Sequence, residues 1–426
     1  MATISEQLKK LILAGRYFVN SMKIALVHDS FTQLGGAERV LDALHELFPD
    51  APVFTLVYDP MFKEKHKTWD IRTSSLQTLY LSLEKLQYLL PLIPWGTDNL
   101  DLKDFDVVIS SSSGWAKNVR VPKNCVHICY CHTPTRFLWS EPDYVKQEVP
   151  WLIRPLAKIF LKSMKKWDYN GAQRVTKFIA NSKEVQGRIK KYYNRESEIV
   201  YPFVDTSFWN ATLLGRHSER VQPSEESQTK NEILHPSDAL GVQDDAENRN
   251  YFLLAGRLHA HKQNDLIVEV FNELGLPLHV VGTGRQEEYL KSIAKPNTKF
   301  LGCISDERLR DEYRGAKALI YPQLEDFGLM PLEAAACGTA TLAYGKGGAL
   351  ETIVSGVTGE FFGVAAATGR HNNGMEAGGL RYKEQIKALL LSWNPQKYSV
   401  DNLRAQAEKF SKEKFKKQLL EIIYLK

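Results

Sequence analysis

Short apolar runs alternate with helical segments along most of this chain, and they form two separate series. The first series comprises residues 23–29, 106–110, 125–131 and 177–181, and the second comprises residues 251–256, 278–282, 299–302, 317–322 and 339–344. Strands that are buried on both faces read as continuous apolar runs, and their alternation with helices is typical of a parallel, doubly wound sheet. The sequence therefore predicts two α/β domains, each with its own parallel sheet.

A polar stretch separates the two series. Residues 210–250 are rich in Ser, Glu, Gln and Asn and contain the run QPSEESQTKNE, a composition typical of a linker or a disordered insertion. A length of 426 residues also suits two domains better than one core. We therefore expect an N-terminal extension over residues 1–21, a first domain over 22–209, a second domain over 251–405, and a C-terminal helix over 406–426 that packs back on the first domain.

The segment EDFGLMPLE places two carboxylates eight positions apart directly after a strand of the second series. Gly328 permits a tight turn and Pro331 suits the start of a helix, so we expect Glu325 in the loop and Glu333 in the first helical turn. The backbone amides from Phe327 to Leu329 and the helix dipole favour an anion there. Glu333 can either stabilise the helix dipole or accept hydrogen bonds from two vicinal hydroxyls.

Two basic residues follow the first strand of the second series. Arg257 offers a planar fork and Lys262 a mobile point charge, and together they can neutralise a diphosphate. A solvated basic loop is the alternative. Because the carboxyl ends of parallel strands meet at one edge, where ligands bind, the position of these residues favours a ligand site.

Glycines and one histidine occupy equivalent positions elsewhere. Gly35 and Gly36 precede a helix after the first strand, where they suit either a diphosphate or a simple flexible turn. Gly282 and Gly284 lack the third glycine of a dinucleotide fingerprint, so we expect them only to let a nucleotide lie close to the backbone. His132 ends the third apolar run and is equally consistent with a structural and a catalytic role.

The motifs LGGAER, AGRL followed by lysine, VGTG, and E-x7-E from Glu325 to Glu333 resemble, in order and spacing, those of family 4 glycosyltransferases with the GT-B architecture. The resemblance runs from about Met22 to the final helix. The stretches HDSFTQLGGAERVL, YCHTPTRFLW and FIANSKEV are further similar to bacterial mannosyltransferases of surface-polysaccharide assembly. The insertion at 210–250 and a glycine-rich loop near Gly369 depart from the compact family pattern.

This resemblance implies a GT-B fold, with two Rossmann-like domains facing a cleft, and a retaining transfer of a hexose, with mannose favoured. The donor would be a nucleoside-diphosphate sugar, GDP-mannose first, and the acceptor a lipid-linked or growing glycan. The implied catalytic residues are Glu325, His132, Arg257 and Lys262, and the implied donor-binding residues are Gly35, Gly36, Gly282, Gly284, Phe327, Gly328, Leu329 and Glu333.

By the same resemblance, Arg257 and Lys262 would hold the diphosphate and Glu333 the ribose hydroxyls. Glu325 and the neighbouring amides would hold the donor sugar, which His132 would touch from the opposing domain. A non-catalytic sugar-nucleotide-binding subunit and a glycoside hydrolase are the alternatives. The hydrolase reading fits poorly, because hydrolysis needs no basic diphosphate clamp.

Composition argues against several other functions. The formal net charge of +5 is too small for the basic stripe of a nucleic-acid-binding protein. The five cysteines are scattered and odd in number, which suggests reduced, buried thiols rather than disulfides or a zinc site. With a basic clamp and no Asp-x-Asp cluster near the nucleotide motifs, we expect no metal and no other cofactor.

No apolar run approaches the roughly 18 residues of a membrane span, and residues 1–21 lack the features of a signal peptide, so we expect a cytoplasmic protein. Residues 151–169 combine Trp, Leu, Ile and Phe with five basic side chains: Arg154, Lys158, Lys162, Lys165 and Lys166. That pattern suits either an interfacial helix on the inner face of the cytoplasmic membrane or a core-packed helix with a solvated basic face.

Overall fold

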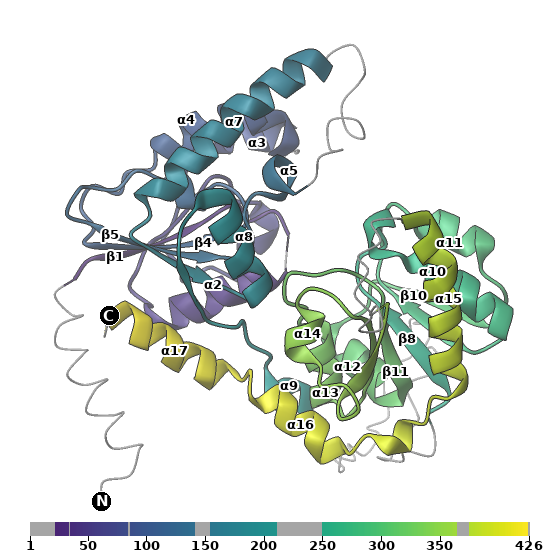
Figure 1. Cartoon of the computed structure of the whole chain (residues 1–426). Helices are drawn as coiled ribbons and strands as arrows, with labels where there is room; N and C mark the ends of the chain where they lie inside the picture. Colours follow the sequence, from purple (N-terminus) through teal and green to yellow (C-terminus); the bar gives the residue numbers. More distant parts are fainter. Residues whose placement is uncertain are drawn as a thin grey trace, which may run out of the picture.

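The computed structural model describes residues 22–33, 35–83, 86–140, 154–210, 249–363 and 375–424, and for residue 87 and residues 375–381 it describes the backbone alone. The predicted extension over 1–21, most of the stretch 210–250 and the loop near Gly369 lie outside the described residues. Figure 1 shows two α/β domains, with the C-terminal segment passing from the second domain back to the first.

The first domain contains a seven-stranded, fully parallel sheet with the order β3-β2-β1-β4-β5-β6-β7. Its strands are β1 (Ile24–His28), β2 (Val53–Thr55), β3 (Ile71–Thr73), β4 (Val107–Ser112), β5 (Val126–Cys131), β6 (Lys177–Ala180) and β7 (Ser197–Ile199). The four apolar runs of the first series correspond to β1, β4, β5 and β6. The remaining three strands have three residues each, too few to show a hydrophobic period.

The second domain has a six-stranded parallel sheet with the order β10-β9-β8-β11-β12-β13. Its strands are β8 (Tyr251–Ala255), β9 (Leu278–Val281), β10 (Thr298–Gly302), β11 (Ala316–Tyr321), β12 (Thr341–Tyr344) and β13 (Gly359–Phe362). The first five correspond to the predicted runs. Both strand orders reverse direction beside the first strand, as in doubly wound folds, so the predicted fold class is confirmed.

Helices cover the faces of both sheets. Those of the first domain are α2 (Gly36–Leu47), α3 (Gln77–Leu83), α4 (Ile93–Asp98), α5 (Arg136–Trp139), α7 (Arg154–Arg174) and α8 (Lys183–Tyr193). Those of the second are α10 (Asn264–Leu274), α11 (Glu287–Ile293), α12 (Asp306–Gly315), α13 (Met330–Ala336), α14 (Ala349–Thr352) and α15 (Met375–Leu391), followed by α16 (Val400–Glu408) and α17 (Lys412–Tyr424). The short α9 (Thr206–Asn210) packs on α13 and α16 of the C-terminal part. None of the helices that the structure describes is long and apolar enough to cross a membrane.

Two segments of the chain run side by side between the domains, one through Val204 and the other through Phe410 and Ser411. The backbone amide of Val204 donates to the carbonyl of Phe410 at 2.9 Å, next to a short parallel bridge between Val204 and Ser411. The C-terminal segment breaks here, so residues 406–426 do not form one helix as expected. Its first part, α16, packs on α13, whereas α17 lies against α2 and contributes to the core of the first domain through Phe415, Leu419 and Ile422.

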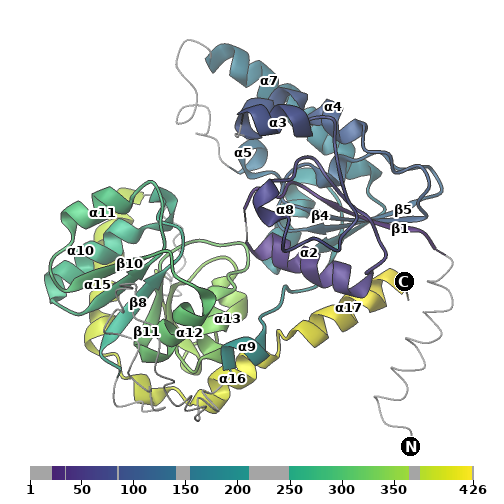
Figure 2. The same ribbon diagram turned by 180° about the vertical axis from the view of Figure 1, so that it is seen from behind.

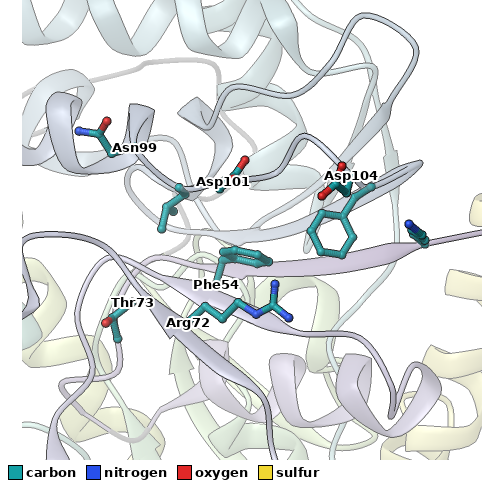
Figure 3. A pocket seen from close by; sticks show the side chains of 9 residues that line it. Phe54, Arg72, Thr73, Asn99, Asp101 and Asp104 are labelled. Atoms are coloured by element: carbon teal, nitrogen blue, oxygen red, sulfur yellow. The ribbon is translucent and has the colours of Figure 1, made fainter.

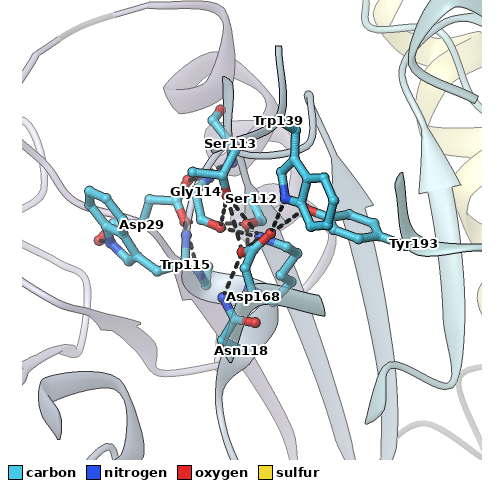
Figure 4. Close-up of polar contacts among 12 residues, drawn as sticks. Asp29, Ser112, Ser113, Gly114, Trp115, Asn118, Trp139, Asp168 and Tyr193 are labelled. Carbon is cyan, nitrogen blue, oxygen red and sulfur yellow. Dashed lines mark hydrogen bonds and ion pairs between the residues drawn. The ribbon is translucent and has the colours of Figure 1, made fainter. Parts of the chain in front are cut away.

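A fully buried carboxylate ties α7 to the first sheet (Figure 4). Asp168 is paired with the ammonium group of Lys117 at 2.6 Å. Its oxygens also accept from the indole of Trp139 and the hydroxyl of Tyr193, both at 2.8 Å. A buried charge is stable only when it is paired and hydrogen-bonded, so this network fixes where α7 sits. One turn later, a Cβ at Gly171 would overlap the side-chain oxygen of Asn118.

We predict that Gly171→Ala destabilises the first domain by about 1–3 kcal/mol, because the added methyl forces α7 away from Asn118. The matched control is Gly187→Ala in α8, where a Cβ meets nothing within 4 Å. Removing a flexible glycine from a helix should stabilise the protein there by roughly 0.5–1 kcal/mol. Urea unfolding measures both, and equal free energies of unfolding for the two variants would contradict the packing argument.

Candidate active site between the two domains

The predicted residues lie where the strands of both sheets end. Gly35 and Gly36 follow β1 and His132 directly follows β5, while Arg257 follows β8 and the loop containing Glu325 follows β11. Side chains from the two domains make direct contact at this edge. The guanidinium of Arg257, for example, lies 3.4 Å from the side-chain oxygen of Gln33. The structure therefore brings both sets of predicted residues to one interface between the domains.

Glu333 is held by a cation from the opposing domain. Its side chain is buried, and Oε1 accepts from Nη1 of Arg39 in α2 at 2.7 Å. The hydroxyl of Tyr313 donates to the other oxygen at 3.3 Å. Burial raises the pKa of Glu333 above its ordinary value, and Arg39 opposes that rise. The predicted ribose-binding carboxylate is thus part of a bridge between the domains.

Asp326, the residue after Glu325, binds two arginines of the first domain. Asp326 is buried and accepts from Arg136 of α5 at 2.7 Å and from Arg188 of α8 at 2.5 Å. Arg188 also donates to the hydroxyl of Thr133 at 3.3 Å. Pairs of this kind, half-buried and charge-assisted, are stronger than surface ion pairs. The motif that carries Glu325 is therefore fixed to the first domain by its neighbour.

Two cations contact Glu325, and the positive charge of Arg257 acts on one of them, Lys262. Lys262 is buried and forms an ion pair with Glu325, and Arg136 lies 3.9 Å from the same carboxylate. Burial lowers the pKa of Lys262 to about 8, and the positive charges of Arg136 and Arg257 contribute to the shift. Like charges held this close repel one another, so an incoming anion would be stabilised by all three.

The turn between Glu325 and Glu333 presents backbone amides. Within the described part of the chain, the amides of Phe327, Gly328 and Leu329 donate no hydrogen bond. Gly328 has a φ of +85°, which only glycine adopts readily. The Phe327 side chain is buried against Tyr201 and Phe410 at the domain connection, so only its amide is available to a ligand.

The glycine pairs have different surroundings. A Cβ at Gly36 would sit 3.4 Å from Leu329, so these residues pack together across the interface, whereas Gly35 only begins α2. A Cβ at Gly282 or Gly284 would collide with the backbone carbonyls of Gly256 and Leu258. The packing of two loops thus explains Gly282 and Gly284 without a ligand, and their predicted contact with a nucleotide stays a prediction.

His132 is the end of a hydrogen-bonded chain. Its Nε2 lies 2.8 Å from the hydroxyl of Ser111, and that hydroxyl lies 3.3 Å from Nδ1 of His28. The other ring nitrogen of His28 lies 3.4 Å from the carboxylate of Glu38. Burial lowers the pKa of His132 to about 4, with a further contribution from His28, so its ring is neutral near pH 7.

Several residues of this site were not predicted. They are His28, Glu38, Arg39, Arg136, Arg188, Asp326 and Glu351, the last of which accepts from the backbone amides of Lys183 and Glu184 at the start of α8. Glu38, Arg39, Arg136 and Asp326 lie within quoted motifs, but only the folded chain shows their partners. For the described residues, no group of three or more His, Cys, Asp or Glu side chains is placed to hold a metal ion.

A hollow of about 440 Å³ lies elsewhere, between β1–β3 and the loop before β4 (Figure 3). Cations and anions both line it, including Lys23, Arg72, Asp101 and Asp104. Lys23 immediately precedes β1, so this hollow is at the amino ends of the strands. Ligands of doubly wound sheets bind at the carboxyl ends, so we place the site at the domain interface and not here.

Two family models match the chain, one for each domain. "Glycosyltransferase Family 4" matches residues 34–208 and "Glycosyl transferases group 1" matches residues 241–368, together most of the sequence. The chain belongs to the family 4 glycosyltransferases. The predicted membership of that family is therefore confirmed, and the site described above is the candidate active site of a glycosyltransferase.

Relatives of this glycosyltransferase include mannosyltransferases. Alpha-1,3/1,6-mannosyltransferase ALG2 of Candida glabrata is 23% identical over 78% of this chain and 78% of that protein. The same-named enzyme of Dictyostelium discoideum is 22% identical over 54% of this chain, and an uncharacterized glycosyltransferase of Methanocaldococcus jannaschii is 28% identical over 28%. The chain spans 56% of the Dictyostelium protein and 33% of the Methanocaldococcus protein.

Solved structures support the same fold. The glycosyltransferase superimposes with a TM-score of 0.64 on sucrose-phosphate synthase from Thermosynechococcus elongatus, at 16% identity over 94% of this chain and 98% of that one. It superimposes with a TM-score of 0.61 on Anabaena HepE in complex with UDP, at 17% identity over 94% and 99%. Identities this low establish the GT-B architecture alone.

We predict that Asp326→Asn loosens the contact between the domains, because it leaves Arg136 and Arg188 without their shared carboxylate. A charge-assisted hydrogen bond is worth about 1.5–3 kcal/mol. Small-angle X-ray scattering should then show a larger radius of gyration. Asp306→Asn is the control, since its pair with Arg39 at 3.6 Å is solvent-exposed and should contribute little. Indistinguishable scattering from wild type and Asp326→Asn would show that Asp326 does not hold the two domains together.

Proposed function

We propose that this glycosyltransferase moves a hexosyl unit, mannose, from a nucleoside-diphosphate sugar to a lipid-linked or growing glycan of the cell surface, with retention of configuration. The observation that carries the proposal is the group of cations at Glu325. Lys262 and Arg136 contact its carboxylate, and the charge of Arg257 acts on Lys262. The amides of the following turn donate to no described residue. That arrangement suits a diphosphate with a sugar attached to it.

The chemistry follows from where charge develops. When the bond between the sugar C1 and the phosphate oxygen breaks, the diphosphate gains negative charge. Each well-aimed donor can stabilise such charge by about 3–4 kcal/mol. Arg257 and Lys262 would hold the diphosphate, and the amides of Phe327 to Leu329 would assist with the donor sugar. Because fixed cations supply the stabilisation, we propose that no metal ion is required.

Retention is assigned to attack on one face of the sugar. The acceptor hydroxyl oxygen bonds to C1 on the side from which the diphosphate leaves, and the hydroxyl proton passes to the departing phosphate oxygen. The products are the glycosylated acceptor and a nucleoside diphosphate. In this scheme Glu325 holds the sugar hydroxyls, Glu333 holds the ribose, and His132 touches the sugar from the first domain.

The donor is proposed to be GDP-mannose. The mannosyltransferase relatives, one of which aligns over 78% of this chain, support mannose. UDP-sugars are the second candidate, because the Anabaena HepE structures contain UDP and UDP-glucose. The transfer assay therefore compares donors with both bases.

Transfer of radiolabelled sugar to a lipid extract tests this function. We expect incorporation from GDP-mannose above that from UDP-glucose and UDP-N-acetylglucosamine, at the same rate with and without EDTA. Incorporation lost in EDTA and restored by Mn²⁺ or Mg²⁺ would contradict the metal-independent mechanism. No incorporation from any donor, with nucleotide binding intact, would favour the non-catalytic subunit.

The two glutamates should separate binding from turnover. We predict that Glu333→Gln weakens binding of the free nucleoside diphosphate by about 1.5–3 kcal/mol, because one partner of the ribose hydroxyls loses its charge. Glu325→Gln should leave that affinity unchanged and lower the transfer rate. Isothermal titration calorimetry measures the affinities, and equal losses in both variants would disprove this division of roles.

We further propose that the enzyme docks on the inner face of the cytoplasmic membrane through α7 and its neighbours. Leu156 and Ile159 are each 69% exposed, and Lys158, Lys162, Lys165 and Lys166 are exposed on the same helix. The helix contains one acid, Asp168, which is fully buried. The exposed surface of α7 is therefore apolar and positive, as anionic lipid requires.

Neighbouring helices extend this surface. In both views α3 and α4 lie beside α7 at one end of the first domain (Figure 1 and Figure 2). Trp167 of α7 packs on the cluster that these helices share. α3, α4 and the 3₁₀ helix between them (Leu86–Leu92) expose further large apolar side chains: Leu79, Leu81, Leu83, Tyr88, Leu92 and Trp95. Apolar side chains gathered in this way are typical of a surface that meets lipid or another protein.

We predict flotation with anionic phosphatidylglycerol vesicles at low salt, and less at high salt, since each lysine near such a surface adds about 1 kcal/mol. Lys158→Glu with Lys162→Glu should reduce it strongly. The matched control is Lys414→Glu with Lys417→Glu on α17, which has the same charge change away from this surface. Absence of flotation, or flotation that ignores lipid charge and salt, would refute docking.

A further inference from the structure

A hydrogen-bonded chain runs from the interior of the first domain to His132. Its members are Glu38 on α2, His28 on β1, Ser111 on β4 and His132 after β5. Successive polar atoms are separated by 3.4, 3.3 and 2.8 Å. Glu38, His28 and Ser111 are each at most 5% exposed, so water does not compete for these bonds. The direction of each bond is therefore determined by the protons that the four groups carry.

Glu38 fixes the first bond. Burial opposes its ionisation, but the hydrogen bond from His28 favours the ionised carboxylate, and the pKa of Glu38 lies below its ordinary value. An ionised carboxylate only accepts hydrogen bonds, so the ring nitrogen of His28 that faces it, Nε2, must carry a proton. A neutral His28 then has no proton on Nδ1, and that nitrogen accepts from Ser111.

Ser111 has a single hydroxyl proton. If it donates that proton to His28, its oxygen accepts from His132, and Nε2 of His132 must be the protonated nitrogen. We propose that Glu38, His28 and Ser111 are positioning residues that hold His132 as the Nε2–H tautomer, which leaves Nδ1 as a bare hydrogen-bond acceptor. No proton is transferred in this arrangement, and the chain only sets which nitrogen is free.

The free nitrogen is available to a ligand in the interface. Nδ1 of His132 makes no hydrogen bond to any described residue. The residues around it face the second domain, since Thr133 contacts Arg188 and Arg136 contacts Asp326. An acceptor in this position binds a hydroxyl and repels a carboxylate oxygen. Given the proposed function, this selects a donor sugar with a hydroxyl at that point over a deoxy or carboxylate analogue.

The tautomer can be measured in the free protein at pH 8, above the ordinary pKa of histidine of about 6.5. Chemical shifts of ¹⁵N-histidine distinguish a protonated from a bare ring nitrogen, and the spectrum of His132→Gln assigns the signals. Wild type should show His132 protonated at Nε2. Ser111→Ala and Glu38→Gln should each give a mixture of His132 tautomers. If Glu38→Gln does not fold, the spectrum of Ser111→Ala alone tests whether the chain sets the tautomer.

Ser110→Ala is the matched control. Ser110 is the residue before Ser111 on β4. Its hydroxyl lies 2.8 Å from Nε2 of His127, another buried histidine, on β5. This variant should change the signals of His127 and leave those of His132 intact. A wild-type His132 protonated at Nδ1, or a His132 tautomer that survives both Ser111→Ala and Glu38→Gln, would overturn the proposal.

The consequence for transfer is measured separately. Ser111→Ala should lower kcat about tenfold, the effect of misaligning one hydrogen bond, with the affinity for free nucleoside diphosphate unchanged. An unchanged kcat would remove the link to the donor sugar. If wild type shows the expected tautomer but transfers no sugar, the proposed function fails while the positioning of His132 stands.

Discussion

The pairing of charges between the two domains determines how the rest of the site is arranged. Asp326 binds Arg136 and Arg188, and Glu333 binds Arg39, so each of these three ion pairs joins a carboxylate of the second domain to a guanidinium of the first. These bonds bring the carboxyl ends of two parallel sheets face to face. They also bring Arg136 to Glu325, which is paired with Lys262 within the second domain. A ligand that bridges the domains therefore meets charged groups already oriented by the protein.

The balance of these charges explains why the site suits an anion. Burial lowers the pKa of Lys262, and the positive charges of Arg136 and Arg257 lower it further, so like charges are held close together here. A diphosphate relieves this repulsion, and it gains charge as its bond to the sugar breaks. On the opposite side, His132 stays neutral through burial, which suits contact with an uncharged sugar. The first domain thus contributes both a guanidinium group, that of Arg136, and a neutral histidine to the interface.

Part of this arrangement can be predicted from the sequence. Long apolar runs such as 125–131 and 317–322 were assigned to the correct sheets, because buried parallel strands are apolar throughout. The three-residue strands β2, β3 and β7 carry no such signal. The pairing of Asp326 with Arg136 and Arg188 spans 190 and 138 positions, and no local pattern encodes a contact of that range. The motif of Gly282 and Gly284 predicts contact with a nucleotide, but it does not indicate that the loop of Gly256 and Leu258 packs against these glycines.

The central claim is that the cations at this interface stabilise a departing diphosphate, and turnover of Lys262→Ala with the donor sugar tests it most directly. We expect kcat to fall by about 10²–10³, the loss that follows removal of one preorganised donor, with the thermal midpoint retained. Lys291→Ala, which removes a half-exposed lysine of α11, should leave kcat unchanged. Wild-type turnover in folded Lys262→Ala would contradict the claim that this cation stabilises the departing diphosphate.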